Sequence, residues 1–174
     1  MSKTEIDWAK MTLQGGANGA DTDGSQIDTS TTAQSAAAML AQNNMAQIDL
    51  MLYRFIEHRQ LFEFIEVYKV YLNNKSKEQE SADNNLDGKT FLHLAIEHSA
   101  TQIASYLLLD AKVDPNVLSH NSQMGVLHVA VNYQRNDLID LVLMSELTNV
   151  NLNSILHGTP LHLACKIGNL KIVQ

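Results

Sequence analysis

The sequence predicts an all-α fold of stacked helix–turn–helix units, and a motif that recurs along the chain is the main observation behind this prediction. The last copy, residues 158–174, reads GTPLHLACKIGNLKIVQ. Thr159 and Pro160 are typical of a helix start, because the hydroxyl caps free N–H groups and proline loses no hydrogen bond at the first helical position. Gly168 can end this helix, and Asn169 can cap a second one.

The same unit occurs twice upstream. One copy begins with DGKTFLHLA at residue 87, and the other contains LHVA at residues 127–130. In both copies a second apolar run of helical spacing follows after a short gap. A single helix pair cannot bury its apolar face alone, so we expect the pairs to stack around one continuous core. The copies are 35 and 34 residues apart, as measured between His93, His128 and His162.

A period of about 33 residues with the pattern T-P-L-H-x-A is the signature of ankyrin repeats. From about residue 87 to residue 174, the chain therefore resembles the ankyrin repeat family. The resemblance implies a solenoid in which each repeat has a hairpin finger, and histidines that hydrogen-bond neighbouring backbone. It also places Cys165 at a small, buried core position. The middle copy departs from the pattern, because Gly125 and Val126 stand where Thr and Pro are usual, which leaves its N-terminal cap in question.

Residues 45–86 are expected to form a degenerate N-terminal capping repeat and a polar loop. Apolar residues recur at helical spacing, and the polar residues 58–60 interrupt the pattern before it resumes at Leu61. Two short helices therefore fit better than one long helix. The sequence Ile-Glu-His at residues 56–58 occurs again at residues 96–98. Terminal repeats of a stack are often atypical, because they also cap it.

Residues 1–44 are predicted to be a disordered, low-complexity tail, since they hold few large apolar side chains and many Ala, Gln, Ser, Thr, Asn and Gly. Such a segment buries too little apolar surface to offset the entropy of ordering. Its Ala-rich part, residues 32–42, can become helical if it docks on another surface. Trp8 is either a solvated tail residue or the anchor of a short partner-binding motif.

Charge and composition exclude several classes of function. The formal charge of −7 argues against binding to nucleic acid, which needs clustered Lys and Arg. We expect no insertion into a membrane, since no apolar run approaches the length of a membrane span. The chain has one cysteine and begins with no apolar signal segment, so we expect an intracellular, cytoplasmic location.

No pattern in the sequence supports catalysis, a cofactor or a metal site, so we expect a protein that is not an enzyme. Residues 83–88 match the first half of a calcium-binding loop, but Leu94 stands where a bidentate carboxylate is needed. His162 and Cys165 lie three residues apart, and two ligands do not make a zinc site. The repeated histidines are expected about 10 Å apart, so they cannot converge on one metal ion.

Function in this architecture is expected on a surface made by the first helices and the fingers, which together form a concave groove. Tyr133 is the best candidate for a binding hot spot, because its ring is large and amphipathic. For any one position the alternative is ordinary solvated surface. The resemblance places the variable positions, called the recognition surface below, at Lys89, Glu97, His98, Met124, Asn132, Tyr133, Gly158, Lys166 and Ile167.

The leading hypothesis is a non-catalytic protein–protein interaction module that forms the N-terminal part of a larger intracellular protein. The alternative is a segment that regulates in cis a C-terminal enzyme such as a kinase, a channel or a lipid-transfer domain. The partner protein is not identified by the sequence. Because residues 87–174 contain two complete repeats and a truncated third, we also expect an exposed apolar C-terminal face, fraying from about Thr159 and self-association into a larger assembly.

Overall fold

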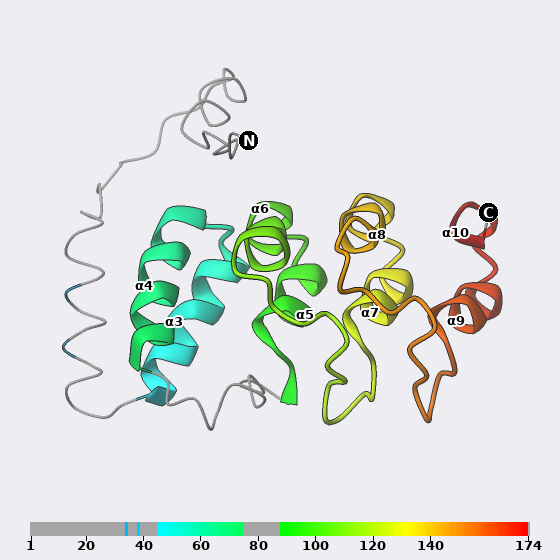
Figure 1. Ribbon diagram of the computed structural model, residues 1–174, viewed down its shortest axis with the longest axis horizontal. Coiled ribbons are helices and arrows are strands. Elements are labelled where there is room, and N and C mark those ends of the chain that lie inside the picture. Colours follow the sequence, from blue (N-terminus) through cyan, green and yellow to red (C-terminus); the bar gives the residue numbers. More distant parts are fainter. Residues whose placement is uncertain (1–33, 35–37, 39–44, 75–87, 174) are drawn as a thin grey trace, which may run out of the picture.

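The fold is a row of helix pairs that lie side by side (Figure 1). The computed structural model describes residues 34, 38, 45–74 and 88–173. The prediction of a disordered tail falls almost wholly outside these residues, as do most of the predicted polar loop and the calcium-loop match. Within the described part of the chain, the structure is helical and contains a single isolated bridge, between Ser154 and Gly158. The predicted all-α repeat fold is confirmed.

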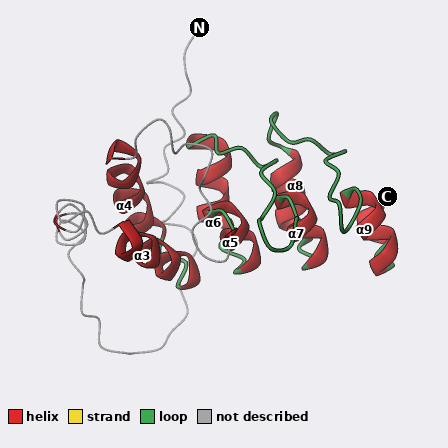
Figure 2. Cartoon of the chain, turned by 90° about the horizontal axis from the view of Figure 1, so that it is seen from below, coloured by secondary structure: helices red, strands yellow, loops and turns green. Residues whose placement is uncertain are grey.

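Each pair consists of two antiparallel helices joined by a tight turn. The long connections before the third and fourth pairs project on the same side of the stack, at the bottom of Figure 1 and along one edge in Figure 2. These connections are the fingers that the resemblance implies. The helices are α3 (Met45–Glu57), α4 (Leu61–Asn74), α5 (Phe91–Glu97), α6 (Thr101–Ser105), the π-helix η3 (Tyr106–Asp110), α7 (Val126–Asn132), α8 (Asn136–Leu143), α9 (Pro160–Ile167) and α10 (Leu170–Val173).

The four turns within the pairs share one backbone conformation. Arg59, Ser99, Gln134 and Gly168 occupy equivalent positions, with φ of 58°, 56°, 55° and 76°. Only glycine adopts this left-handed region without steric cost. In the first three turns the next residue's N–H donates to the carbonyl five positions earlier, at 2.8, 2.8 and 3.0 Å. The α3–α4 turn therefore has the same geometry as the turns of the motif-bearing pairs.

An aromatic cluster joins the first pair to the second. The rings of Phe64 and Tyr68 stack at 5.3 Å, and the Tyr68 ring meets Phe91 edge-on at 6.1 Å. These residues and Tyr71 are buried. Edge-on and offset aromatic pairs add to the free energy gained by burying their area. The aromatic cluster is thus part of the core, and it attaches α3 and α4 to the stack.

Helix starts follow the motif where threonine is present. Thr90 Oγ1 accepts from the N–H of His93 at 3.3 Å, and Thr159 Oγ1 accepts from that of His162 at 3.4 Å. Gly125 has no side chain to do the same for α7. A Cβ placed on Gly125 would lie 2.5 Å from Leu152 Cδ2, so the finger that follows occupies the space of a cap. The expectation that the N-terminal cap of α7 departs from the motif is therefore confirmed.

Cys165 was predicted to be buried, and that prediction is wrong, because the thiol is exposed. The equivalent residue of the preceding pair, Val131, is buried. Val131 is covered by the pair that follows it, whereas no described element lies beyond α9 on that side. Leu161 is 56 % exposed and Leu170 is 75 % exposed for the same reason. Among the described residues, the apolar face at this end of the stack is uncovered.

Candidate functional site

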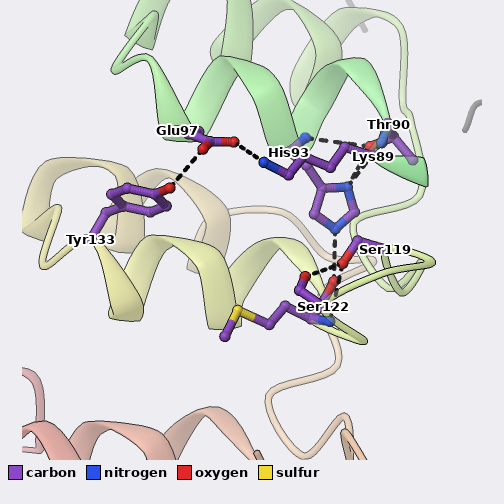
Figure 3. Close-up of polar contacts among 8 residues, drawn as sticks. Lys89, Thr90, His93, Glu97, Ser119, Ser122 and Tyr133 are labelled. Carbon is purple, nitrogen blue, oxygen red and sulfur yellow. Dashed lines mark hydrogen bonds and ion pairs between the residues drawn. The ribbon is translucent and has the colours of Figure 1, made fainter. Parts of the chain in front are cut away.

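Three residues of the recognition surface meet on the inner face of the stack. Lys89 precedes α5, Glu97 is the last residue of α5, and Tyr133 directly follows α7. Lys89 Nζ lies 2.6 Å from Glu97 Oε2, and the Tyr133 hydroxyl donates to Glu97 Oε1 at 2.6 Å (Figure 3). The Glu97 carboxylate therefore bridges two successive repeats, since Glu97 and Tyr133 are 36 residues apart in sequence. We call this cluster the Lys89–Glu97–Tyr133 bridge.

The bridge fixes the charge state of its members. Partial burial opposes ionisation of Glu97, but hydrogen bonds from Lys89 and Tyr133 outweigh it and lower the pKa of the carboxyl below its usual value. The hydrogen bond to Glu97, with a smaller contribution from burial, raises the pKa of Tyr133 to about 12. At neutral pH the site therefore contains a carboxylate held between an ammonium group and a neutral phenol.

His98 also takes part in the contacts between repeats. Its ring lies edge-on to that of Tyr53 at 5.5 Å, and its carbonyl accepts from Arg59 Nη2 at 3.3 Å. The α3–α4 pair thus contacts both the ring and the backbone of His98. His98 is half-buried, so part of it remains available to a partner.

The remaining positions of the recognition surface differ in exposure. Asn132 and Lys166 are exposed. Ile167 is half-buried and packs against the core. The most accessible of these remaining positions therefore lie at the ends of α7 and α9.

Met124 and Gly158 each contribute a backbone carbonyl that accepts a hydrogen bond from a buried histidine. The carbonyl of Met124 accepts from His93 Nε2 at 2.9 Å, and the carbonyl of Gly158 accepts from His128 Nε2 at 2.9 Å. The Nδ1 atom of each histidine accepts from the N–H of the residue before its helix, so Nε2 carries the proton. Each histidine thus ties its helix to the following finger, which we call the histidine ladder.

Burial keeps the ladder uncharged. It lowers the pKa of His93 to about 4 and also lowers the pKa of His128. Both side chains are fully buried. The prediction that the motif histidines hydrogen-bond neighbouring backbone is confirmed for His93 and His128, and at pH 7 these two rings do so in the neutral form.

The contacts between the two fingers were not predicted from the sequence at the level of single residues. Asn116 Nδ2 donates to the carbonyl of Leu147 at 2.7 Å, and Asn116 Oδ1 accepts from the N–H of Asn149 at 2.8 Å. A signal was present, because Asp114-Pro115-Asn116 and Asn149-Val150-Asn151 are separated by the repeat period. The second finger also exposes Ile155, which is 85 % accessible.

Metal-ligating side chains do not cluster among the described residues. No group of three His, Cys, Asp or Glu side chains in this part of the chain is arranged to hold a metal ion. Over the same residues, no helix combines the length and apolarity that crossing a membrane requires.

Comparison with known proteins points to one family. The family model of the ankyrin repeat matches residues 87–120 and 157–174. A curated relative, the NF-kappa-B inhibitor alpha of Gallus gallus, is 31 % identical over 90 residues. The aligned region covers 51 % of this chain and 28 % of the relative, so the chain spans less than a third of the relative's length. The first matched segment contains α5 with His93, the second contains α9 and α10, and the pair with His128 lies between them.

Proposed function

We propose, from the ankyrin repeats matched at residues 87–120 and 157–174, that this chain is a non-catalytic module that binds a protein partner. Binding uses the recognition surface on the first helices together with the fingers. Repeats of this kind expose these elements as one extended surface, because each repeat contacts only its neighbours. We further propose that the module belongs to a larger intracellular protein.

The observation that carries this proposal is the exposed ring of Tyr133 within an ordered polar cluster. Tyr133 is 42 % exposed although its hydroxyl is held by Glu97. Large aromatic rings are enriched at binding hot spots, and a ring that is already held loses little entropy when a partner binds. Asn132 and Lys166 lie exposed in equivalent positions of their repeats and can supply polar contacts around the ring.

The curated relative agrees with a role in binding. Its name describes an inhibitor of NF-kappa-B, which is an action exerted on another molecule. A module that inhibits without a catalytic site acts by occupying a surface of its target. The identity of the target does not follow from an alignment that covers 28 % of the relative.

Affinity capture with matched variants tests the proposal. We expect Tyr133→Ala combined with Lys166→Glu to lose a partner that the wild-type chain retains, with thermal stability changed by no more than about 1 kcal/mol. Asp140→Ala is the control, because Asp140 is exposed on the outer helix α8. Proteins retained equally by the double variant and the control would contradict the proposed surface.

A further inference from the structure

The hydroxyl of Tyr133 is already committed, although its ring is accessible. It donates to Glu97 Oε1 at 2.6 Å, while 42 % of the residue is exposed. A hydrogen bond to a carboxylate is charge-assisted and stronger than one between neutral groups. A partner therefore has little to gain by competing for the hydroxyl, and it meets the aromatic ring instead.

The carboxylate beside this ring retains hydrogen-bonding capacity. Two carboxylate oxygens offer about four acceptor positions. Lys89 donates to one oxygen of Glu97 and Tyr133 donates to the other. Glu97 can therefore accept a further N–H from a group lying over the Tyr133 ring, without release of Lys89.

One common side chain matches both features. The guanidinium of arginine is planar, stacks on aromatic rings and donates N–H groups to carboxylates. Lysine is a point charge that does not stack in this way, and an apolar side chain has no donor for Glu97. The net charge of −7 also favours the approach of a cationic partner.

We propose that the recognition surface takes an arginine side chain of its protein partner, stacked on the Tyr133 ring and hydrogen-bonded to Glu97. This inference rests on the proposed function and names the chemical group that the surface recognises. Tyr133 supplies the face for stacking, Glu97 supplies the acceptor, and Lys89 holds Glu97 in place (Figure 3).

The test uses four blocked tripeptides of the form acetyl-Gly-X-Gly-amide, in which X is arginine, citrulline, lysine or norleucine. Each is titrated into the ¹⁵N-labelled full chain at neutral pH while the amide signals of Glu97 and Tyr133 are followed. We expect saturable shifts with the arginine peptide, and binding at least about threefold weaker with the other three. Citrulline is the matched control, because it keeps the shape of arginine and removes its charge.

Variants separate the ring from the hydroxyl. We expect Tyr133→Phe to bind the arginine peptide within about twofold of the wild type, and Tyr133→Ala to bind about fivefold more weakly. Glu97→Gln should weaken binding as well, whereas Asp140→Asn on α8 should not change it. Each variant is first shown to have wild-type helicity by circular dichroism. If Tyr133→Ala does not fold, the comparison of Tyr133→Phe with Glu97→Gln still tests the inference, because only Glu97→Gln should weaken binding of the arginine peptide.

Three results of the peptide titrations would overturn the inference. They are equal binding of citrulline and arginine peptides, unchanged binding in Glu97→Gln, and shifts that spread over the surface without dependence on Tyr133. Capture of a partner that requires Tyr133 but presents no arginine to it would also overturn the inference, and it would leave the proposed function intact.

Discussion

Two junctions between repeats share one scaffold and differ in what lies on it. At both junctions, α5 to α7 and α7 to α9, a buried histidine donates to a carbonyl of the next finger at 2.9 Å. The first junction adds the Lys89–Glu97–Tyr133 bridge. The second junction has Asn132 and Ile167 at the positions equivalent to Glu97 and Tyr133. Isoleucine has no donor, so no comparable bridge can form. The ladder is thus a property of the motif, whereas the bridge belongs to this chain.

The largest expected effect comes from breaking the ladder. We expect His93→Ala to destabilise the chain by about 2–4 kcal/mol, because it leaves the Met124 carbonyl without its donor and opens a cavity. His162→Ala is the matched control, since His162 is exposed, and its cost should stay below about 1 kcal/mol. Urea unfolding followed by circular dichroism measures both. Equal losses would show that the ladder does not depend on burial.

Acid should weaken the ladder in a defined pH window. The pKa of His93 falls from 6.5 to about 4 on folding, so the unfolded chain binds more protons between these values. Stability is therefore full above about pH 6.5 and declines as the pH falls toward 4, by about 3 kcal/mol at most for this group. Urea midpoints between pH 7 and pH 4 report the decline. It should be shallower in His93→Gln, and an unchanged slope would contradict the assignment.

The bridge is expected to contribute less than the ladder. A double-mutant cycle of Glu97→Gln and Tyr133→Phe should give a coupling free energy of about 1 kcal/mol, typical of a charge-assisted hydrogen bond that is partly exposed. Ultraviolet titration offers a second readout. In Glu97→Gln the pKa of Tyr133 should move down from about 12 toward its usual value, since its main cause is removed.

Grafting the bridge onto the second junction would sharpen the comparison. Met124→Lys, Asn132→Glu and Ile167→Tyr reproduce the three positions at α7 and α9. We expect the triple variant to gain up to about 1 kcal/mol relative to the same variant with Ile167→Phe in place of tyrosine. Thermal unfolding of the two proteins isolates the hydroxyl. No difference between them would show that the bridge needs more than these three side chains.

The smallest effect concerns the turns within the α5–α6 and α7–α8 pairs, which both carry strain. Ser99→Gly and Gln134→Gly should each stabilise the chain by about 0.5–1 kcal/mol, because both residues have positive φ. Ser99→Gly should gain more. Its hydroxyl is buried without a hydrogen-bond partner, whereas Gln134 accepts from Asn169 at 3.3 Å. Thermal unfolding tests the order, and destabilisation by Ser99→Gly would contradict the assignment of strain.

The contrast between the ladder and the bridge also explains which features of the structure could be predicted from the sequence. Thr90, Thr159 and Gly168 act locally, within one helix end, and motif reasoning predicted their roles. The bridge between Glu97 and Tyr133 requires two side chains from different repeats to meet, and a one-dimensional pattern does not give that distance. The exposure of Cys165 depends on what lies beyond α9 rather than on the residue itself.

The first helix pair, α3–α4, resembles a repeat in its structure rather than in its sequence motif. Residues 45–86 lack the threonine–histidine motif, so sequence pattern alone identifies them poorly. The α3–α4 turn has the same positive φ, at Arg59, and the same backbone hydrogen bond as the later turns. We propose on this basis that the pair is a degenerate repeat. Arginine can occupy the position only at a conformational cost, which the packing of the aromatic cluster offsets.

The histidine ladder also gives the stack a direction. Each ring donates to a carbonyl that belongs to the repeat after it, as His128 does to Gly158. Opening of α9 and its finger breaks the His128 bond and leaves the His93 bond in place, whereas opening of α5 does the reverse. Each repeat is thus latched by its own histidine to the repeat after it. The latches are alike, so amide exchange should spread from the end where Leu161 and Leu170 are uncovered.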